Sequence, residues 1–120
     1  MSDPANNTSL FGIHGMALEL QSQRMGLLTS NIANASTPGY KARDIDFGAA
    51  LKARVNGAAT DQATAANVQY RVPVMPSMDG NTVEMGTEQL AFGQNAVAYS
   101  STLSFLTDQV GEIRRAIKGE

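Results

Sequence analysis

The stretch FGQNAVAYSSTLSFLTDQVGEIRRAI, residues 92–117, decides the fold. Its apolar residues are spaced alternately four and three apart in one uninterrupted series: Phe92, Ala96, Tyr99, Leu103, Leu106, Val110, Ile113 and Ile117. A heptad series of this length predicts a helix whose apolar seam packs against another helix. Glu84 and Glu88 precede the series and Lys118 follows it, an order that suits the helix dipole. We therefore expect a C-terminal coiled-coil helix within residues 83–120.

A second amphipathic pattern lies at the other end of the chain. Its apolar seam, again with spacings of three and four for most of its length, is formed by Leu10, Ile13, Ala17, Leu20 and Leu27. The pattern predicts a helix over residues 9–34, after a flexible N-terminus of residues 1–8. Pro38 disfavours helix in the residue before it, and Thr37-Pro38-Gly39-Tyr40 has the order of a type II turn. Residues 9–47 thus form one segment, a helix followed by a turn.

The middle of the chain, residues 48–82, differs in composition. Residues 56–67 contain no large apolar side chain and are rich in Ala, Thr and Gln, so we expect a mobile loop there. Apolar and polar residues then alternate from Val68 to Val74, which indicates a short strand. Pro73 favours an edge strand or an extended segment. We interpret residues 48–82 as a variable loop and extended arm.

These segments predict a mainly α fold with one structural domain. The two long terminal helices would form an antiparallel α-helical hairpin or coiled coil, with an extended irregular or short β segment between them. Val97 and Phe105 lie off the main seam of the C-terminal helix and add apolar surface. Apolar surface beyond what one partner helix covers favours further association. The alternative is that the middle folds back and completes a monomeric core.

The composition argues against several classes of function. The chain has 11 acidic and 9 basic residues, so it offers no general basic surface for nucleic acid. It has no cysteine, and His14 is its only histidine, which makes a protein-ligated zinc site improbable. Asp44 and Asp46 are close in sequence but fall in a polar segment that we expect to be solvated. We expect no enzymatic activity and no cofactor.

The sequence shows neither a membrane-span pattern nor a secretory signal-peptide pattern. No stretch approaches the roughly 20 consecutive apolar residues of a membrane span. The polar N-terminus, Met1 to Ser9, lacks the basic and apolar regions of a secretory signal peptide. The expectation is a protein that stays in the cytoplasm or is exported without cleavage of a signal peptide.

One motif gives a more specific indication. SNIANASTPGYKA, residues 30–42, resembles the N-terminal signature of the flagellar axial proteins, the family of rod, hook and hook-associated subunits. RDIDF, residues 43–47, and the stretch from Glu88 to Leu106, with Asn95 and Tyr99, resemble the proximal-rod member of that family. The resemblance implies a structural component of the proximal rod of the bacterial flagellar basal body. It also implies type III export and assembly in the periplasm, through coiled-coil packing of the terminal helices, into a torque-transmitting tube.

The resemblance further implies partners. They are copies of the chain itself, the rod proteins FlgC and FlgF, the adaptor FliE, the MS-ring protein FliF and, transiently, the export gate. Nucleic acid and direct membrane insertion are not implied. Two alternatives remain: another axial subunit such as FlgC, or a soluble coiled-coil adaptor or export chaperone.

The signature residues also have a physical interpretation. Asn31 and Asn34 are three apart and lie near one helical face, where their amides could bond backbone groups at the helix end or a neighbouring subunit. Gly39 is expected to take a positive φ angle, and Tyr40 to anchor the turn on the C-terminal helix. Together with Thr37 and Pro38 they would fix the angle at which the arm leaves the helix.

Two further features allow two readings each. Arg24, on the otherwise apolar seam, is either a surface residue with a buried stem or an inter-subunit ion-pair partner of Asp108 or Glu112. Phe47 and Leu51 have the Phe-x-x-x-apolar form of the motif through which early flagellar subunits engage the export gate. The same pair could instead pack on one face of a short helix.

Overall fold

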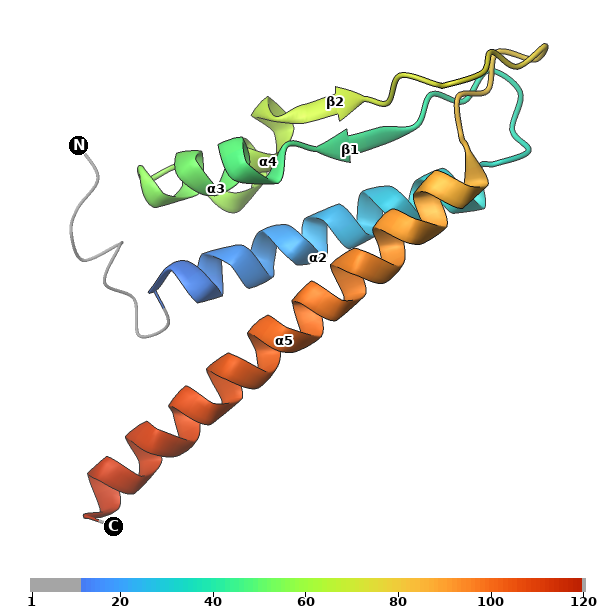
Figure 1. Ribbon diagram of the computed structural model, residues 1–120. Coiled ribbons are helices and arrows are strands. Elements are labelled where there is room, and N and C mark those ends of the chain that lie inside the picture. Colours follow the sequence, from blue (N-terminus) through green and yellow to red (C-terminus); the bar gives the residue numbers. More distant parts are fainter. Residues whose placement is uncertain (1–11, 120) are drawn as a thin grey trace.

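The computed structural model describes residues 12–119 and shows an elongated molecule, 64 × 33 × 18 Å in extent (Figure 1). In chain order its elements are α2 (Gly12–Ala33), β1 (Arg43–Ile45), α3 (Phe47–Val55), α4 (Thr60–Ala66), β2 (Val68–Tyr70) and α5 (Met85–Lys118). The flexible N-terminus predicted for residues 1–8, and the seam residue Leu10, lie outside the described residues.

Helices α2 and α5 lie side by side and run in opposite directions (Figure 1). The contacts between the two helices fit a single antiparallel alignment. The Asn95 amide donates to the Gln21 carbonyl oxygen at 2.9 Å, and nearer the start of α2 the rings of His14 and Phe105 lie 4.3 Å apart. The prediction of a mainly α fold built on an antiparallel helical hairpin is confirmed.

The buried face of α2 is displaced slightly from the predicted seam. Met16, Leu20 and Leu28 are buried, whereas Ile13 is exposed and Leu27 is half-buried. Ala17 is also half-buried. Because the buried residues follow the same helical period, the helix itself is confirmed, and it ends at Ala33.

Helix α5 has 34 residues and ends at Lys118, and Gly119 caps it in the left-handed conformation with a φ of 75°. Of the predicted seam only Leu106 is fully buried, and Leu103 and Ile117 are 45% and 81% exposed. The other seam residues are half-buried: Phe92, Ala96, Tyr99, Val110 and Ile113. The buried stripe is rotated by about one residue from the seam and includes polar side chains, Glu88 and Asn95.

The middle of the chain contains more regular structure than predicted. The loop prediction for residues 56–67 is wrong over α4, Thr60–Ala66. The only buried residue in α4 is Ala63, whose small side chain lets the short helix approach the core closely. Alanine also has the highest helix propensity, so packing at one position and local preference act together.

A two-stranded antiparallel sheet joins the segment before α3 to the segment after α4. Strand β1 pairs with β2 in the register Arg43 to Tyr70 and Ile45 to Val68. The prediction of a short strand is confirmed for β2, but β1 was not predicted. Val72 and Val74 lie beyond the sheet and are exposed, and the chain bends at Val74.

The apolar core lies between α2 and the middle of the chain. Leu20, Ile45, Ala50 and Ala63 form its buried centre, with half-buried Phe47 and Leu51 among the side chains packed against it. The middle therefore folds back on α2, as the alternative interpretation held, and it does so without covering all of the apolar surface of α5.

Candidate functional site

Asn31, at the end of α2, is the centre of a buried polar junction. Its side chain is fully buried and makes every hydrogen bond available to an amide. Its Nδ2 donates to the Arg43 carbonyl oxygen at 2.7 Å and to Glu88 Oε1 at 2.9 Å. Its Oδ1 accepts from the Arg43 N–H at 3.0 Å and from the Tyr40 hydroxyl at 3.3 Å. Asn31 thus joins α2 to β1 and to α5 at one point.

Four charged side chains form a linked series that reaches this amide through Glu88. Glu88 of α5 is fully buried and accepts from Arg71 Nε at 2.6 Å, while Arg71 Nη2 reaches Asp44 Oδ2 at 3.1 Å. Arg24 of α2 binds the same Asp44 carboxylate in bidentate fashion, since its Nε donates to Oδ1 and its Nη2 donates to Oδ2, both at 2.9 Å. The ion-pair series Arg24–Asp44–Arg71–Glu88 therefore links α2 and α5 to β1 and to the end of β2. We call these four residues and Asn31 the junction.

The charges of the junction are fixed by their neighbours. Burial by itself would raise the pKa of Asp44, but hydrogen bonds from Arg24 and the Ile45 N–H, and the charges of Arg24 and Arg71, together hold that pKa below its usual range. Burial by itself would lower the pKa of Arg71, but Glu88 and Asp44 raise it. Both groups remain charged at neutral pH, which supports a structural role for the network.

The signature turn adjoins the junction. The Tyr40 N–H donates to the Thr37 carbonyl oxygen at 3.2 Å across Pro38 and Gly39, and Gly39 has a φ of +75°. The predicted positive φ is confirmed. The predicted anchoring of Tyr40 on the C-terminal helix is wrong, because its hydroxyl lies 2.9 Å from Ser30 Oγ and also bonds Asn31, both in α2.

The two signature asparagines have different roles. Asn34 acts locally, since its Nδ2 donates to the Ser30 carbonyl oxygen at 2.8 Å and its Oδ1 accepts from Thr37 Oγ1 at 3.0 Å. Asn31 spans three elements. Of the two readings given for these amides, the described contacts fit bonding to the chain's own groups.

Asn81 closes the turn from the other side. Its Nδ2 lies 2.7 to 3.1 Å from the carbonyl oxygens of Asn34, Ala35 and Thr37, in the turn that follows α2. Its Oδ1 accepts from the Val83 N–H at 2.7 Å. A single buried side chain therefore couples the end of α2 to the segment that leads into α5.

The structure bears on the two interpretations of Arg24 and on those of Phe47 and Leu51. Arg24 pairs with Asp44 of its own chain, and its predicted pairing with Asp108 or Glu112 of a neighbouring subunit stays a prediction. Phe47 and Leu51 lie on α3 against the apolar core, which agrees with the packing interpretation. That contact leaves the export-gate interpretation untested, because it concerns the unfolded chain.

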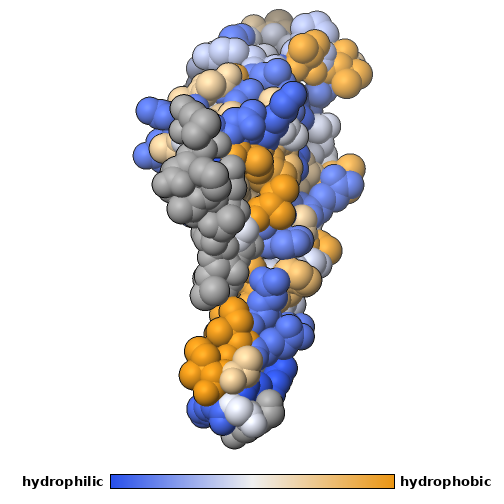
Figure 2. Space-filling view, turned by 90° about the vertical axis from the view of Figure 1, so that its left-hand side faces the viewer, coloured by the Kyte–Doolittle hydropathy of each residue, from blue (hydrophilic) through white to orange (hydrophobic). Residues whose placement is uncertain are grey.

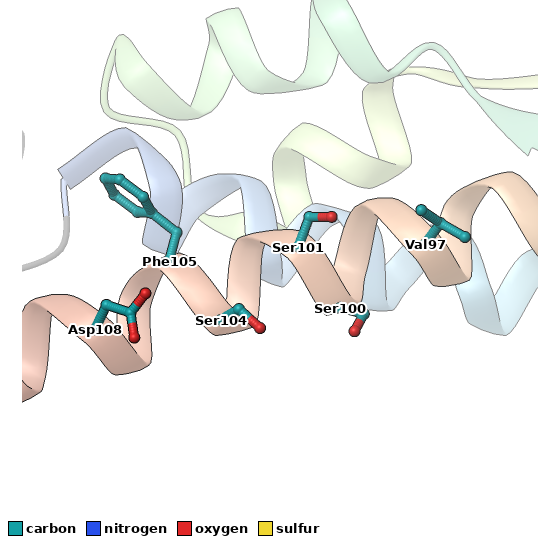
Figure 3. A pocket seen from close by; sticks show the side chains of 6 residues that line it. All are labelled: Val97, Ser100, Ser101, Ser104, Phe105 and Asp108. Carbon is teal, nitrogen blue, oxygen red and sulfur yellow. The ribbon is translucent and has the colours of Figure 1, made fainter.

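The open surface of α5 has a shallow hollow lined by Val97, Ser100, Ser101, Ser104, Phe105 and Asp108 (Figure 3). All six side chains come from one helix, and Phe105 points toward α2. A nucleophilic serine requires a base within hydrogen-bond reach, and no such bond joins these groups among residues 12–119. No group of three or more metal-binding side chains occurs in the same part of the chain.

Sequence reasoning missed Asp44, Arg71, Glu88 and Asn81 as functional residues. A signal was present, because Arg24 and Asn31 are seven apart on α2, and Glu88 and Asn95 are seven apart on α5. In an antiparallel pair, two polar positions at heptad spacing on each helix face one another. Nothing in the pattern marked Asn81, which appeared as an ordinary turn residue.

The fold and junction define a class of protein: a helical hairpin subunit whose arm is locked to its base by a buried polar network and whose longer helix remains partly unpartnered. A family model described as flagella basal body rod protein matches residues 12–41, which include α2 and the signature turn. The match ends two residues before β1.

Comparison with curated proteins extends the match over most of the chain. The flagellar basal body rod protein FlgB of Cereibacter sphaeroides is 49% identical over 91% of this chain and 94% of its own length. FlgB of Aeromonas hydrophila is 39% identical over 92% of this chain and 93% of its own, and FlgB of Escherichia coli K12 is 41% identical over 78% and 82%. The chain belongs to the FlgB family of flagellar basal body rod proteins.

The chain is accordingly a structural component of the rod of the flagellar basal body. Between residues 12 and 119, no helix combines the length and the apolar character that crossing a membrane requires.

Proposed function

We propose that the chain forms the proximal part of the rod, where its terminal helices pack with those of neighbouring copies into a torque-transmitting tube. The observation that carries this proposal is the unpartnered surface of α5. Leu90 and Val97 are 63% and 68% exposed on the same helix that buries Glu88 and Asn95 against α2. Exposed apolar side chains along a helix are typical of a surface that another protein covers.

The junction suits a subunit that transmits torque. A force on α5 reaches the arm through Glu88 and Arg71, and reaches α2 through Asn31. Charge-assisted hydrogen bonds in a buried site resist deformation because breaking one leaves a charged group without a partner. The hairpin and arm would then turn as one body.

The proposal includes the route and the partners implied by the family. The chain would cross the inner membrane unfolded through the type III apparatus, without signal-peptide cleavage, and assemble in the periplasm. Its neighbours would be its own copies, FlgC and FlgF along the rod, and FliE and FliF at its base. It would act without catalysis and without a cofactor.

Substitution on the open face of α5 tests the assembly. Val97→Glu places a charge on a side chain that the subunit leaves exposed, so the circular dichroism spectrum of the purified chain should be unchanged. In cells that lack the native copy, the variant should be secreted but absent from isolated rods, and the cells should not swim. Thr87→Glu, at an exposed polar position near the start of the same helix, is the matched control and should support swimming. Normal swimming with Val97→Glu would contradict the proposal.

The export-gate role of Phe47 and Leu51 needs a separate test. Phe47→Ala should lower the secretion rate of the chain if the motif is read in the unfolded state. Ile45→Ala is the control, because it removes an apolar side chain from the same core without changing the motif. Equal secretion of both variants would restrict Phe47 to packing in the folded subunit.

A further inference from the structure

We infer that the C-terminal end of α5 docks into an acidic groove between α2, α4 and α5 of a second copy of the chain. The inference rests on the proposed function, since it names the two surfaces through which copies of the subunit join. It assigns roles to side chains that the junction does not use.

The groove carries both apolar and acidic groups. Leu18 and Tyr99 line it together with Glu19 and Asp61. Glu19 accepts from Arg54 at 3.2 Å, yet half of its side chain stays exposed. Asp61 is exposed and pairs with no basic side chain among residues 12–119. The groove can therefore accept a cation beside an apolar contact.

The end of α5 has the complementary groups. Ile113 and Ile117 are four apart on one face of the helix, and Arg114 and Lys118 are four apart on the adjoining face. Ile117 is 81% exposed, and both basic side chains are exposed without an acidic partner in the described part of the chain. Figure 2 shows orange apolar atoms beside blue hydrophilic ones at the lower end of the molecule, where α5 ends.

One copy cannot bring these two surfaces together. Tyr99 and Ile117 belong to the same continuous helix, whose rise of ~1.5 Å per residue separates them by roughly 27 Å. Residues 107–118 also extend past the described start of α2, away from the groove (Figure 1). The occupant of the groove is therefore the α5 end of another copy.

Such a contact joins different surfaces of the two partners. Heterologous contacts that do not close on themselves generate open helical assemblies. Each copy would offer one groove and one helix end, so that addition could continue along the rod axis. The stagger between neighbours would be close to the distance from groove to helix end.

Disulfide cross-linking tests the inference, because the chain has no cysteine of its own. Copies carrying Asp61→Cys and copies carrying Lys118→Cys are expressed together, and isolated basal bodies are oxidised with oxygen and a copper catalyst. We expect a disulfide-linked dimer on a non-reducing gel. The control replaces Asp61→Cys with Thr29→Cys, an exposed position further along α2, and should give at least five-fold less dimer.

Exchanging the charges of Asp61 and Lys118 gives a second test, which does not require two thiols to lie close enough to form a disulfide. Asp61→Lys should reduce swimming and rod incorporation roughly two- to five-fold, as expected for loss of one exposed ion pair and gain of a repulsion. Combining Asp61→Lys with Lys118→Glu should restore both. Absence of the 61–118 dimer, a control dimer of equal yield, or failure of the exchange to restore incorporation would overturn the docking. Absence of the unmodified chain from rods would instead contradict the proposed function.

Discussion

Glu88→Gln is the substitution that the junction makes most informative. Glu88 is fully buried and accepts two hydrogen bonds from Arg71 and one from Asn31. Glutamine replaces one carboxylate oxygen with an NH2 group, which cannot accept from Arg71, so one of the two bonds from Arg71 is lost. A hydrogen bond to a charged group contributes about 1.5–3 kcal/mol, so the expected loss is roughly 2 kcal/mol. Arg71 keeps Asp44 as a partner, which limits the loss to less than the 3–5 kcal/mol typical of an isolated buried pair.

Urea denaturation at pH 7, followed by circular dichroism, measures the free energy of unfolding. We expect Glu88→Gln to lower it by about 2 kcal/mol without a change in the m-value. Glu112→Gln makes the same chemical change on an exposed position of α5 and should stay within about 0.5 kcal/mol of the unmodified chain. Equal stability of the two variants would refute the claim that the junction holds the arm to the hairpin.

Three further predictions follow from the turn and the network. Hydrogen bonds and nearby arginines hold the folded-state pKa of Asp44 below its unfolded value, so ionised Asp44 stabilises the fold above about pH 4. Urea midpoints measured from pH 6 to pH 3 should fall as the pH drops below that value, and they should fall less steeply in Asp44→Asn. Gly39→Val forces a β-branched residue into φ +75° and should cost about 1–3 kcal/mol in the same assay and impair rod assembly, whereas Gly26→Ala within α2 should be neutral or slightly stabilising. Asn81→Asp replaces a donor facing three carbonyl oxygens with an acceptor and should lower the thermal midpoint by several degrees, unless the end of α2 is held without it.

The elements that sequence predicted well are those with long periodic patterns. Heptad spacing from Phe92 to Ile117 was enough to predict α5, because a helix that long repeats its signal many times. The Thr37-to-Tyr40 turn was predictable because only glycine readily adopts the φ that position 39 requires. The periodicity predicted helix α5 correctly, but the predicted apolar seam lies about one residue away from the face that is buried.

The missed elements depend on contacts between distant segments. Strand β1 has only three residues, too few for a recognisable alternation, and it becomes a strand by pairing with β2. Helix α4 buries only Ala63, so its sequence resembles that of a loop until the core places Leu20 and Ile45 beside it. Tertiary packing forms β1 despite a weak local preference, and in α4 it adds to the helix preference of alanine.

The junction could be anticipated only in part. Asn31 was identified from the signature, but its partner Glu88 was interpreted only as a residue that suits the helix dipole. Arg24 stood out on an apolar seam, yet Asp44, its actual partner, lay in a segment expected to be solvated. A carboxylate enters a buried site only with cations and donors around it, and the sequence does not show which of them meet in the fold.

The central claim is that the junction forms within each subunit, whereas neighbouring copies cover the exposed surface of α5. Amide hydrogen exchange tests this claim most directly when the purified chain is compared with isolated basal bodies. We expect slow exchange at the Arg43 N–H and over residues 28–33 in both samples, because the junction belongs to the subunit. Residues 107–118 should exchange rapidly in the free chain and slowly in the rod. Rapid exchange around Arg43 in the free chain, or unchanged exchange over residues 107–118 on assembly, would contradict the claim.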